Sequence, residues 1–310
     1  MKKKIVALLT VVTVVGALLA GCGSTEAEAP VAETPATEEA PVEEAAPEET
    51  EEIVEEATDT LGPDTQAIID RGVLKVGVKN AVVGFGFQDT LTGEYSGMEI
   101  SIAEKIAEKL GVDVEFTAVT AATRTELLDS GDIDCVLATF TITDERKESW
   151  DFSTPYFTDH VTVLVETASG ITDLAGLKDA VVGVSSGSTS AKSLTKAMIE
   201  AGVIEGTDFD EETFDPATWT EGVTFKQYDD YPAISTALSA GEVDAFCVDK
   251  SILAIYNTDD RSYIEEEFAP QDYGVATKKG SDFSDYVENC ITEWLADGTI
   301  DGYIAENGLE

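Results

Sequence analysis

The sequence predicts an α/β protein built from two doubly wound lobes. Short apolar segments typical of strands alternate with segments whose apolar residues recur at helical spacing, and Gly111 ends the first of these helical segments. The alternation starts again after residue 160, which indicates a second lobe. Strands that alternate with helices form parallel sheets with right-handed crossovers, so we expect two such sheets.

Each block contributes its own set of elements. In the first block we expect strands at 73–78, 112–116 and 133–139 and helices at 99–110 and 123–131. In the second block we expect strands at 161–166, 180–185, 222–228 and 242–248 and helices at 189–201 and 231–240. Residues 203–221 interrupt the second block, and we interpret them as a surface insertion.

Residues 1–21 are predicted to be a lipoprotein signal peptide. "MKKK" precedes an apolar run from Ile5 to Ala20, as in secretory signals. The run ends in "LAGC", which resembles the lipobox of bacterial lipoproteins and implies cleavage before Cys22 and lipidation of its thiol. The protein is then expected on the outer face of the cell membrane, held by its lipid. An ordinary signal peptide or a signal anchor is the alternative.

Residues 22–63 are predicted to form an acidic, disordered tether behind the lipidated cysteine. The stretch from Gly23 to Thr60 holds 14 acidic residues and no Lys, Arg or aromatic residue. Such a segment buries too little apolar surface to offset its ordering entropy. Binding of a basic partner is the alternative use of this charge.

Composition and residue content exclude several function classes. Residues 61–310 contain 16 basic and 48 acidic side chains, a net charge of −32, which argues against a nucleic-acid partner. Beyond Cys22, the odd number of cysteines argues against a disulfide framework, and Cys135 and Cys247 are expected in the core.

Enzymatic and metal-binding motifs are incomplete. "GVSSG" matches a nucleophile elbow around Ser185, but His160, the only histidine, precedes it, whereas that fold needs its histidine afterwards. One histidine and unclustered cysteines supply no zinc site, and the dinucleotide and phosphate loop patterns are incomplete. We therefore expect no catalytic residue, no metal and no cofactor.

Polar residues gather after the predicted strands. They are Lys79, Thr139 to Arg146, "SSGSTS" at 185–190, and Asp249. In doubly wound sheets, ligands bind beyond the carboxyl ends of the strands, and a helix start with hydroxyls near Ser188 suits a carboxylate.

Each of these residues also has a purely structural interpretation. Arg124 could pair with Glu126 or Asp129 at the surface, and Arg146 with Asp144 or Glu145. The hydroxyls at 188–189 could serve only as helix caps, and Asp249 could cap a helix over 250–256.

Several longer motifs resemble one family. "LKVGVK", "TGEYSGMEISIAEKIAEKLG", "SGDIDCVLATFTITDERKESWDFSTPYF", "VGVSSGSTSAKSL", "AGEVDAFCVDKSILA" and "YGVATKKG" occur in the order found in family 3 solute-binding proteins of ABC transporters for polar amino acids. The resemblance covers roughly residues 70–305. "TAATRTELLDSG", "FCVDKSIL" and "PQDYG" make the chain most similar to aspartate/glutamate-binding members.

The resemblance implies a type II periplasmic-binding-protein-like fold, in which a hinge of two crossings joins the lobes. Residues 64–157 would form the first part of lobe 1, 158–272 lobe 2, and 273–310 a return segment of lobe 1. It also implies a monomer that captures glutamate or aspartate by hinge closure and passes it to ABC permease subunits.

The family pattern implies roles for the first group of site residues. Arg146 would clamp the α-carboxylate of the ligand, helped by Thr141 and by the backbone around Ser188 and Thr189.

A second group would complete the site. Asp249 and Thr139 would take the α-ammonium group, and Phe85 would pack on the aliphatic part of the ligand. Tyr273 would lie near the second hinge crossing and could touch the ligand.

Lys79 and Arg124 would hold a side-chain carboxylate, which implies an acidic ligand. The alternatives are glutamine or another polar amino acid, a dehydratase-like enzyme on the same fold, or an adhesin or sensor partner. The stretch "NAVVGF" departs from the family pattern and leaves the geometry after Lys79 open.

Overall fold

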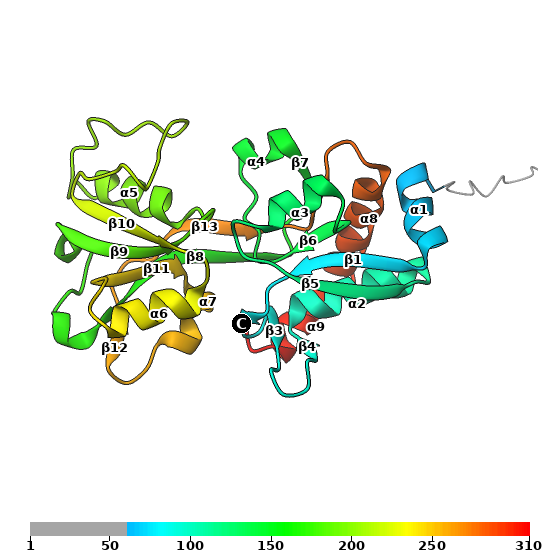
Figure 1. Cartoon of the computed structure of the whole chain (residues 1–310), viewed down its shortest axis with the longest axis horizontal. Helices are drawn as coiled ribbons and strands as arrows, with labels where there is room; N and C mark the ends of the chain where they lie inside the picture. Colours follow the sequence, from blue (N-terminus) through cyan, green and yellow to red (C-terminus); the bar gives the residue numbers. More distant parts are fainter. Residues whose placement is uncertain (1–60) are drawn as a thin grey trace, which may run out of the picture. The chain divides into compact units, whose positions relative to one another are not determined.

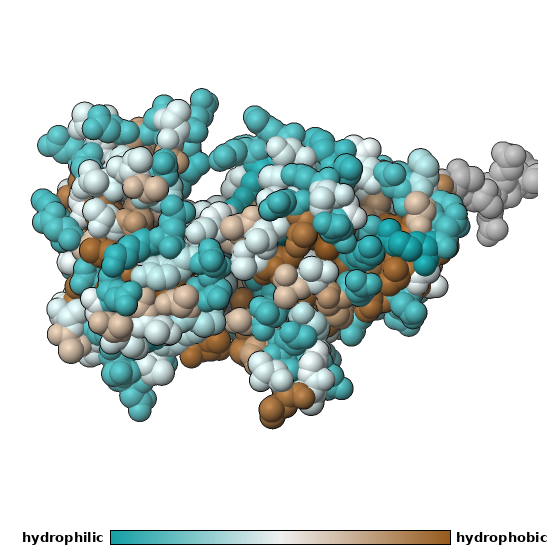
Figure 2. Space-filling view, viewed as in Figure 1, coloured by the Kyte–Doolittle hydropathy of each residue, from teal (hydrophilic) through white to brown (hydrophobic). Residues whose placement is uncertain are grey.

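The computed structural model describes residues 61–310. The predicted signal peptide, the lipidation site Cys22 and nearly all of the predicted tether lie outside the described residues and stay predictions. Within residues 61–310, no helix has both the length and the apolar character needed to cross a membrane. Hydrophilic residues cover most of the face seen in Figure 2, in keeping with the acidic composition.

The first sheet forms the centre of lobe 1, and its strand order is β5-β1-β6-β14-β7 (Figure 1). Its strands are β1 (Val73–Val78), β5 (Asp113–Ala118), β6 (Cys135–Leu137), β7 (Trp150–Phe152) and β14 (Ala276–Lys278). A small sheet of β2 (Ala81–Val82), β3 (Gly86–Gln88) and β4 (Tyr95–Ser96) follows Lys79. The helices are α1 (Pro63–Arg71), α2 (Met98–Leu110), α3 (Arg124–Ser130), α4 (Asp144–Ser149), α8 (Asp282–Ala296) and α9 (Thr299–Glu306).

The second sheet forms the centre of lobe 2, with the order β10-β9-β11-β8-β12 and β13 also paired with β8. Its strands are β8 (Phe157–Glu166), β9 (Ala180–Ser185), β10 (Val223–Tyr228), β11 (Ala245–Asp249), β12 (Arg261–Tyr263) and β13 (Phe268–Tyr273). The helices are α5 (Ser190–Glu200), α6 (Tyr231–Ser239) and α7 (Lys250–Leu253), with short 3₁₀ turns at Thr167–Ser169, Ala175–Leu177 and Ala254–Tyr256.

Both sheets carry apolar residues on both faces. In β11, Ala245 and Cys247 join the cluster that contains the buried residues of α5, whereas Phe246 and Val248 join the cluster that contains those of α6. Successive side chains of a strand point to opposite faces, so a strand covered by helices on both sides is apolar throughout. The prediction of two doubly wound α/β lobes is therefore confirmed.

The prediction of parallel sheets is confirmed for part of each sheet and is wrong for the strands beside the crossings. β1 runs parallel to β5 and β6, and β9 runs parallel to β10 and β11. However, β14 is antiparallel to β6 and β7, and β8 is antiparallel to β11, β12 and β13. These reversed strands adjoin the two crossings: β8 follows the first, and β14 follows the second.

The two crossings between the lobes lie side by side. The chain leaves lobe 1 between β7 and β8 and returns between β13 and β14. β8 and β13 pair antiparallel, with Tyr273 opposite Phe157 (Figure 1). Tyr273 also pairs with Thr141 in an isolated bridge, so the segment after β6 reaches the same place.

The insertion at 203–221 packs on lobe 2 through its aromatic residues. The rings of Phe209 and Phe214 lie 6.0 and 5.6 Å from the ring of Trp219, whose side chain is buried. Phe214 also contacts Phe225 of β10, at 6.3 Å between ring centres. Most acidic residues of the insertion are exposed, so it forms a folded cover with a charged outer surface.

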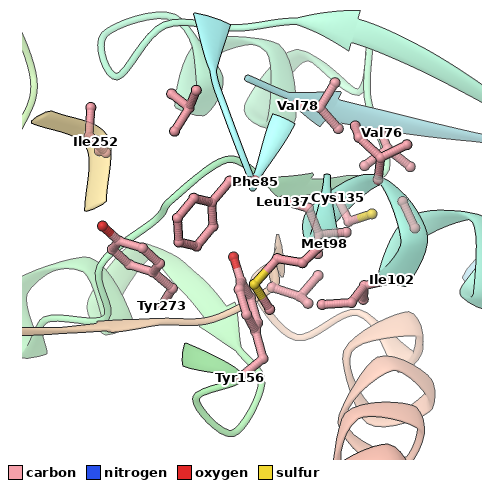
Figure 3. Packing of buried hydrophobic residues seen from close by; sticks show 14 of the residues in the cluster. Val76, Val78, Phe85, Met98, Ile102, Cys135, Leu137, Tyr156, Ile252 and Tyr273 are labelled. Atoms are coloured by element: carbon pink, nitrogen blue, oxygen red, sulfur yellow. The ribbon is translucent and has the colours of Figure 1, made fainter. Parts of the chain in front are cut away.

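The core predictions for the cysteines are confirmed. Cys135 and Cys247 are buried as free thiols, and so is Cys290 of α8. Burial raises the pKa of the Cys290 thiol to about 11, so it is uncharged at neutral pH. Figure 3 shows Cys135 among Met98, Ile102 and Leu137 in the large cluster that extends from lobe 1 into lobe 2.

Candidate functional site

A small cavity of about 10 Å³ lies where the two lobes meet. It is lined by Arg124, Thr139, Thr141, Ser188, Thr189, Ser190, Tyr231, Val248 and Asp249. The segments after β6 and β11 and the starts of α3, α5 and α6 contribute these residues. The cavity thus lies at the carboxyl ends of strands, where doubly wound sheets bind ligands.

Arg124 is a buried residue of the cavity wall and only 3% exposed. Its Nη1 donates hydrogen bonds to the carbonyl oxygens of Ala138 (2.8 Å) and Thr139 (3.2 Å). The guanidinium carbon lies 3.8 Å from the centre of the Phe140 ring. The alternative of a solvated surface pair with Glu126 or Asp129 is therefore wrong, because the helix start points this side chain inward.

Lys79 follows β1 and is buried beside the cavity. Its Nζ lies 5.3 Å from the centre of the Tyr231 ring, which comes from α6 of the other lobe. Burial, and then the positive charge of Arg124, lower the pKa of Lys79 to about 7. Burial also lowers the pKa of Arg124 to about 10, so Arg124 stays charged at neutral pH.

Arg146 joins the two lobes at the mouth of the cavity. Its Nη1 donates to the carbonyl oxygen of Thr141 (2.7 Å) and its Nη2 to that of Gly187 (3.1 Å). Its expected surface partners are engaged elsewhere within the described residues: Glu145 pairs with Lys192 and Asp144 with Lys147. The surface-pair alternative for Arg146 is therefore wrong. Burial lowers the pKa of Arg146 to about 9.

Gly187 lies where the backbones of the two lobes come close together. A Cβ atom at this position would lie 2.8 Å from the carbonyl oxygen of Ala121 in lobe 1. Its φ of +74° is also one that side-chain-bearing residues rarely adopt. Glycine is therefore required here for two independent reasons.

Thr139 holds a strained backbone conformation in the cavity wall, with φ of +45°. Its N–H donates to Oε1 of Glu99 (2.6 Å), which also accepts the hydroxyl of Tyr156 (2.6 Å). Its carbonyl oxygen accepts from Arg124. Burial raises the pKa of Glu99. Glu99 therefore holds the backbone N–H of the strained Thr139, and Arg124 holds its carbonyl oxygen.

Asp249 ends β11 and faces the cavity, and its carboxylate accepts the hydroxyl of Tyr273. Burial, and then the nearby Asp159, raise the pKa of Asp249 to about 7. Asp249 precedes α7 without making a side-chain cap, so the helix-cap alternative for it is wrong. Asp159 itself accepts from the backbone of Ser251 (3.1 Å).

The hydroxyls at the start of α5 are also engaged with other parts of the chain. Thr189 occupies the N-cap position without making a side-chain cap, and its Oγ1 donates to Oε1 of Gln271 (2.7 Å). Thr141 donates to the same oxygen (2.8 Å). The Ser188 hydroxyl donates to the carbonyl oxygen of Ser185 (2.7 Å). The alternative of simple capping at 188–189 is wrong for Thr189.

Three buried polar atoms of the cavity-lining residues have no hydrogen-bond partner within residues 61–310: Nε of Arg124, Oγ1 of Thr139 and Oγ of Ser190. Buried polar groups in native proteins are nearly always hydrogen-bonded. Two of the three groups belong to residues predicted to bind ligand. A water molecule or the polar groups of a ligand would supply the missing hydrogen-bond partners.

Phe85 lies in the core beneath the crossings and is not among the residues that line the cavity. Its ring packs edge-on against Phe157 (5.1 Å between ring centres) and Tyr273 (5.7 Å). Figure 3 shows Phe85 between Tyr273 and the strands of lobe 1. Its predicted contact with a ligand stays a prediction, and its visible role is to support Tyr273.

The structure brings most predicted site residues together: Arg124, Thr139, Thr141, Ser188, Thr189 and Asp249 line the cavity, and Lys79, Arg146 and Tyr273 adjoin it. Tyr231, Val248, Glu99 and Gln271 were not predicted as site residues, and Ser190 was predicted only as part of the polar segment 185–190. The predicted helix 231–240 begins directly after a strand end, and this position could have identified Tyr231. A charged Glu99 beside apolar helix positions was a signal for a buried partner.

The chain belongs to the bacterial extracellular solute-binding proteins, family 3, whose model matches residues 74–307. It is 32% identical over 254 residues to the ABC transporter glutamine-binding protein GlnH of Bacillus subtilis (strain 168), covering 80% of this chain and 84% of that protein. It is 26% identical over 264 residues to the glutamate-binding protein GluB of Corynebacterium efficiens, covering 79% and 82%.

The fold matches solved binding proteins. An ancestral arginine-binding protein bound to arginine superimposes with a TM-score of 0.64 at 33% identity, covering 76% of this chain and 98% of that one. Together with the two lobes and paired crossings, this confirms the predicted type II periplasmic-binding-protein-like fold.

Proposed function

We propose that this protein captures an acidic amino acid, glutamate or aspartate, outside the cytoplasm and delivers it to an ABC permease. Membership of the solute-binding family and relatives named for glutamine, glutamate and arginine support an amino-acid ligand. The ligand is trapped between the lobes when the cleft closes, and the protein acts as a monomer without catalysis.

The charge of the cavity is the observation that carries the acidic assignment. Three cationic side chains face or adjoin the cavity: Lys79, Arg124 and Arg146. The carboxylates that act on Lys79 and Arg124 are Glu99 and Asp249, whereas Asp159 acts on Asp249 and accepts hydrogen bonds from Ser251 and Tyr273. An acidic amino acid brings one ammonium and two carboxylates, and its net negative charge offsets the surplus of positive charge.

The groups divide between the two ends of the ligand. Arg146, helped by Thr141 and by the backbone around Ser188 and Thr189, meets the α-carboxylate, and Asp249 with Thr139 meets the α-ammonium group. Lys79 and Arg124, on the lobe 1 side, meet the side-chain carboxylate. Charge-assisted hydrogen bonds of this kind are about twice as strong as neutral ones, so they dominate the choice of ligand.

Glutamine is the second candidate ligand, favoured by the relative named for it. The lowered pKa of Lys79, about 7, would let this side chain lose its proton beside a neutral amide. Arg124 would nevertheless stay charged and incompletely paired, which is costly for a buried group.

Calorimetric titration of the wild type with glutamate, aspartate, glutamine and asparagine tests the assignment. We expect the acids to bind at least about 100-fold more tightly than their amides. Incubation of candidate acids with the protein tests the dehydratase alternative, because an enzyme would form product and a binding protein would return the acid unchanged.

Membrane attachment is a separate part of the proposal. We expect Cys22→Ala to release the protein from the membrane or to leave the precursor uncut. A variant that is still lipid-labelled and membrane-bound would show that the lipobox assignment is wrong, while the ligand assignment would be unaffected.

A further inference from the structure

Gln271 lies in β13, the strand that leads into the second crossing, and it is buried. We propose that Gln271 is a positioning residue that links lobe 1 to lobe 2 through Thr141 and Thr189 and thereby favours the closed cleft. The inference rests on the proposed function only in that closure of the cleft traps the ligand.

The geometry fixes which end of the Gln271 amide faces the threonines. Nε2 donates to the carbonyl oxygens of Ala269 (2.8 Å) and Pro270 (3.3 Å). The pairing of β13 with β8 shifts register between Phe268 and Pro270, and Ala269 has a φ of +47°. This irregularity places carbonyl groups next to the amide nitrogen, so the amide oxygen points the other way.

That oxygen accepts two hydrogen bonds from different lobes. Thr141 follows β6 of lobe 1, and Thr189 directly precedes α5 of lobe 2; their hydroxyls donate to Oε1 of Gln271 at 2.8 and 2.7 Å. A hydroxyl has one hydrogen to donate. The hydroxyl hydrogen of each threonine is therefore used in the bond to Gln271. Only the oxygen lone pairs and the backbone groups of the two threonines are left to interact with a ligand.

Other contacts between the lobes involve charged side chains, such as the hydrogen bond from Arg146 to the carbonyl oxygen of Gly187. Lys192 and Glu145 pair at 3.1 Å at the rim, where the Glu145 side chain is 76% exposed. Exposed pairs contribute little because water screens them. The Gln271 link is buried and does not depend on which ligand is bound. Loss of the Gln271 link should lower the fraction of protein with a closed cleft. The affinity for every ligand should then fall by the same factor.

Closure can be followed with labels on either side of the cleft. Glu148 lies one turn beyond Glu145 on α4, and Glu212 adjoins Glu211, which pairs with Lys196 of α5. The substitutions Glu148→Cys and Glu212→Cys would carry spin labels in protein that also has Cys22→Ser and is purified in detergent. The three cysteines within the described residues are buried, so they should not react.

The experiment measures how much glutamate, aspartate or glutamine is needed for half-maximal closure. Loss of one or two neutral hydrogen bonds predicts that Gln271→Met raises each of these concentrations about threefold to tenfold, by a similar factor for all three ligands. Thr189→Val should raise the concentration for half-maximal closure by a comparable factor. The double variant should need no more ligand than the single variant that has the higher half-maximal concentration. Thr195→Val is the matched control, because the Thr195 hydroxyl bonds within α5 to Ala191, and it should cause no shift.

An unchanged midpoint in Gln271→Met, a shift confined to one ligand, or multiplied effects in the double variant would overturn the inference. If Gln271→Met does not accumulate, Thr189→Val against Thr195→Val decides the question. A wild type that closes on amides as readily as on acids would overturn the acidic ligand alone. Failure to close on any amino acid would overturn the proposed function and this inference together.

Discussion

The hydroxyl of Tyr273 donates a hydrogen bond to the carboxylate of Asp249, and this bond joins the second crossing to the end of β11. The ring of Tyr273 packs against the rings of Phe85 and Phe157, at 5.7 and 5.9 Å between ring centres. The residue expected to bind the ligand ammonium is therefore oriented by the hinge itself.

Tyr273→Phe should weaken binding of every amino acid by about tenfold or more, because it removes one buried hydrogen bond to a charged group. The bond from Tyr273 lowers the pKa of Asp249, so its loss should raise that pKa further. The variant should consequently lose affinity at a higher pH than wild type during acid titration. Affinity measured at several pH values would show this, and identical curves for the two proteins would contradict it.

Affinity for an acidic ligand should peak near pH 7. Lys79 must be charged to hold a carboxylate, and its pKa is lowered to about 7, so affinity should fall as pH rises above that value. Asp249 must be ionised to hold the ammonium, and its pKa is raised to about 7, so affinity should also fall as pH drops below it. Each loss approaches about tenfold per pH unit far from the midpoint.

Two variants separate the limbs of this profile. Lys79→Met should remove most of the fall in affinity above pH 7, and Asp249→Asn should remove most of the fall below pH 7. Both variants should bind more weakly than wild type overall. Titrations from pH 5.5 to 8.5 would be needed. Affinity that is independent of pH in the wild type would argue against both assignments.

Arg146→Ala and Asp249→Ala should each weaken binding of all amino acids by at least about 30-fold, since removal of one partner of a buried charged contact costs about 2–5 kcal/mol. Lys192→Ala is the control at the rim, where loss of the pair with Glu145 should change affinity less than about fivefold. Equal effects of the three substitutions would place Arg146 and Asp249 outside the site.

Gly187→Ala should hinder closure. The added methyl group would meet the Ala121 carbonyl oxygen at 2.8 Å, and the backbone would be strained at a φ of +74°. Gly241→Ala is a suitable control, because it has a similar φ of +69° in lobe 2 with open space around its Cβ position. We expect a much larger loss of affinity for Gly187→Ala, and similar affinities for the two variants would show that contact at Gly187 does not limit closure.

The elements of the fold were predictable where the periodicity was strong. β1 and α2 match the predicted segments within one residue, because burial of one or both faces leaves a clear apolar pattern. The strand predicted at 133–139 is shorter, Cys135–Leu137, since Thr139 turns away from the sheet with a positive φ. Strand direction at β8 and β14 depends on how the chain crosses between lobes, which local pattern does not encode.

The candidate site was predictable to the extent that it follows strand ends. Position alone singled out three residues: Lys79 follows β1, Thr139 follows β6, and Asp249 is the last residue of β11. The inward direction of Arg124 was predictable only from the family resemblance, because spacing along α3 suits a surface pair equally well. Gln271 was hidden for another reason: its partners, Thr141 and Thr189, are 130 and 82 residues away.

The central claim is that Lys79 and Arg124 select a side-chain carboxylate, and one comparison tests it most directly. Dissociation constants for glutamate, aspartate, glutamine and asparagine would be measured by calorimetry on wild type, Arg124→Ala, Lys79→Met and Arg71→Ala. Arg71 serves as the control because its guanidinium lies at the surface of lobe 1, paired with Asp134. Wild type and Arg71→Ala should prefer the acids by at least about 100-fold, whereas Arg124→Ala and Lys79→Met should lose most of this preference and keep some binding. Wild-type protein that binds the amides as tightly as the acids would contradict the claim.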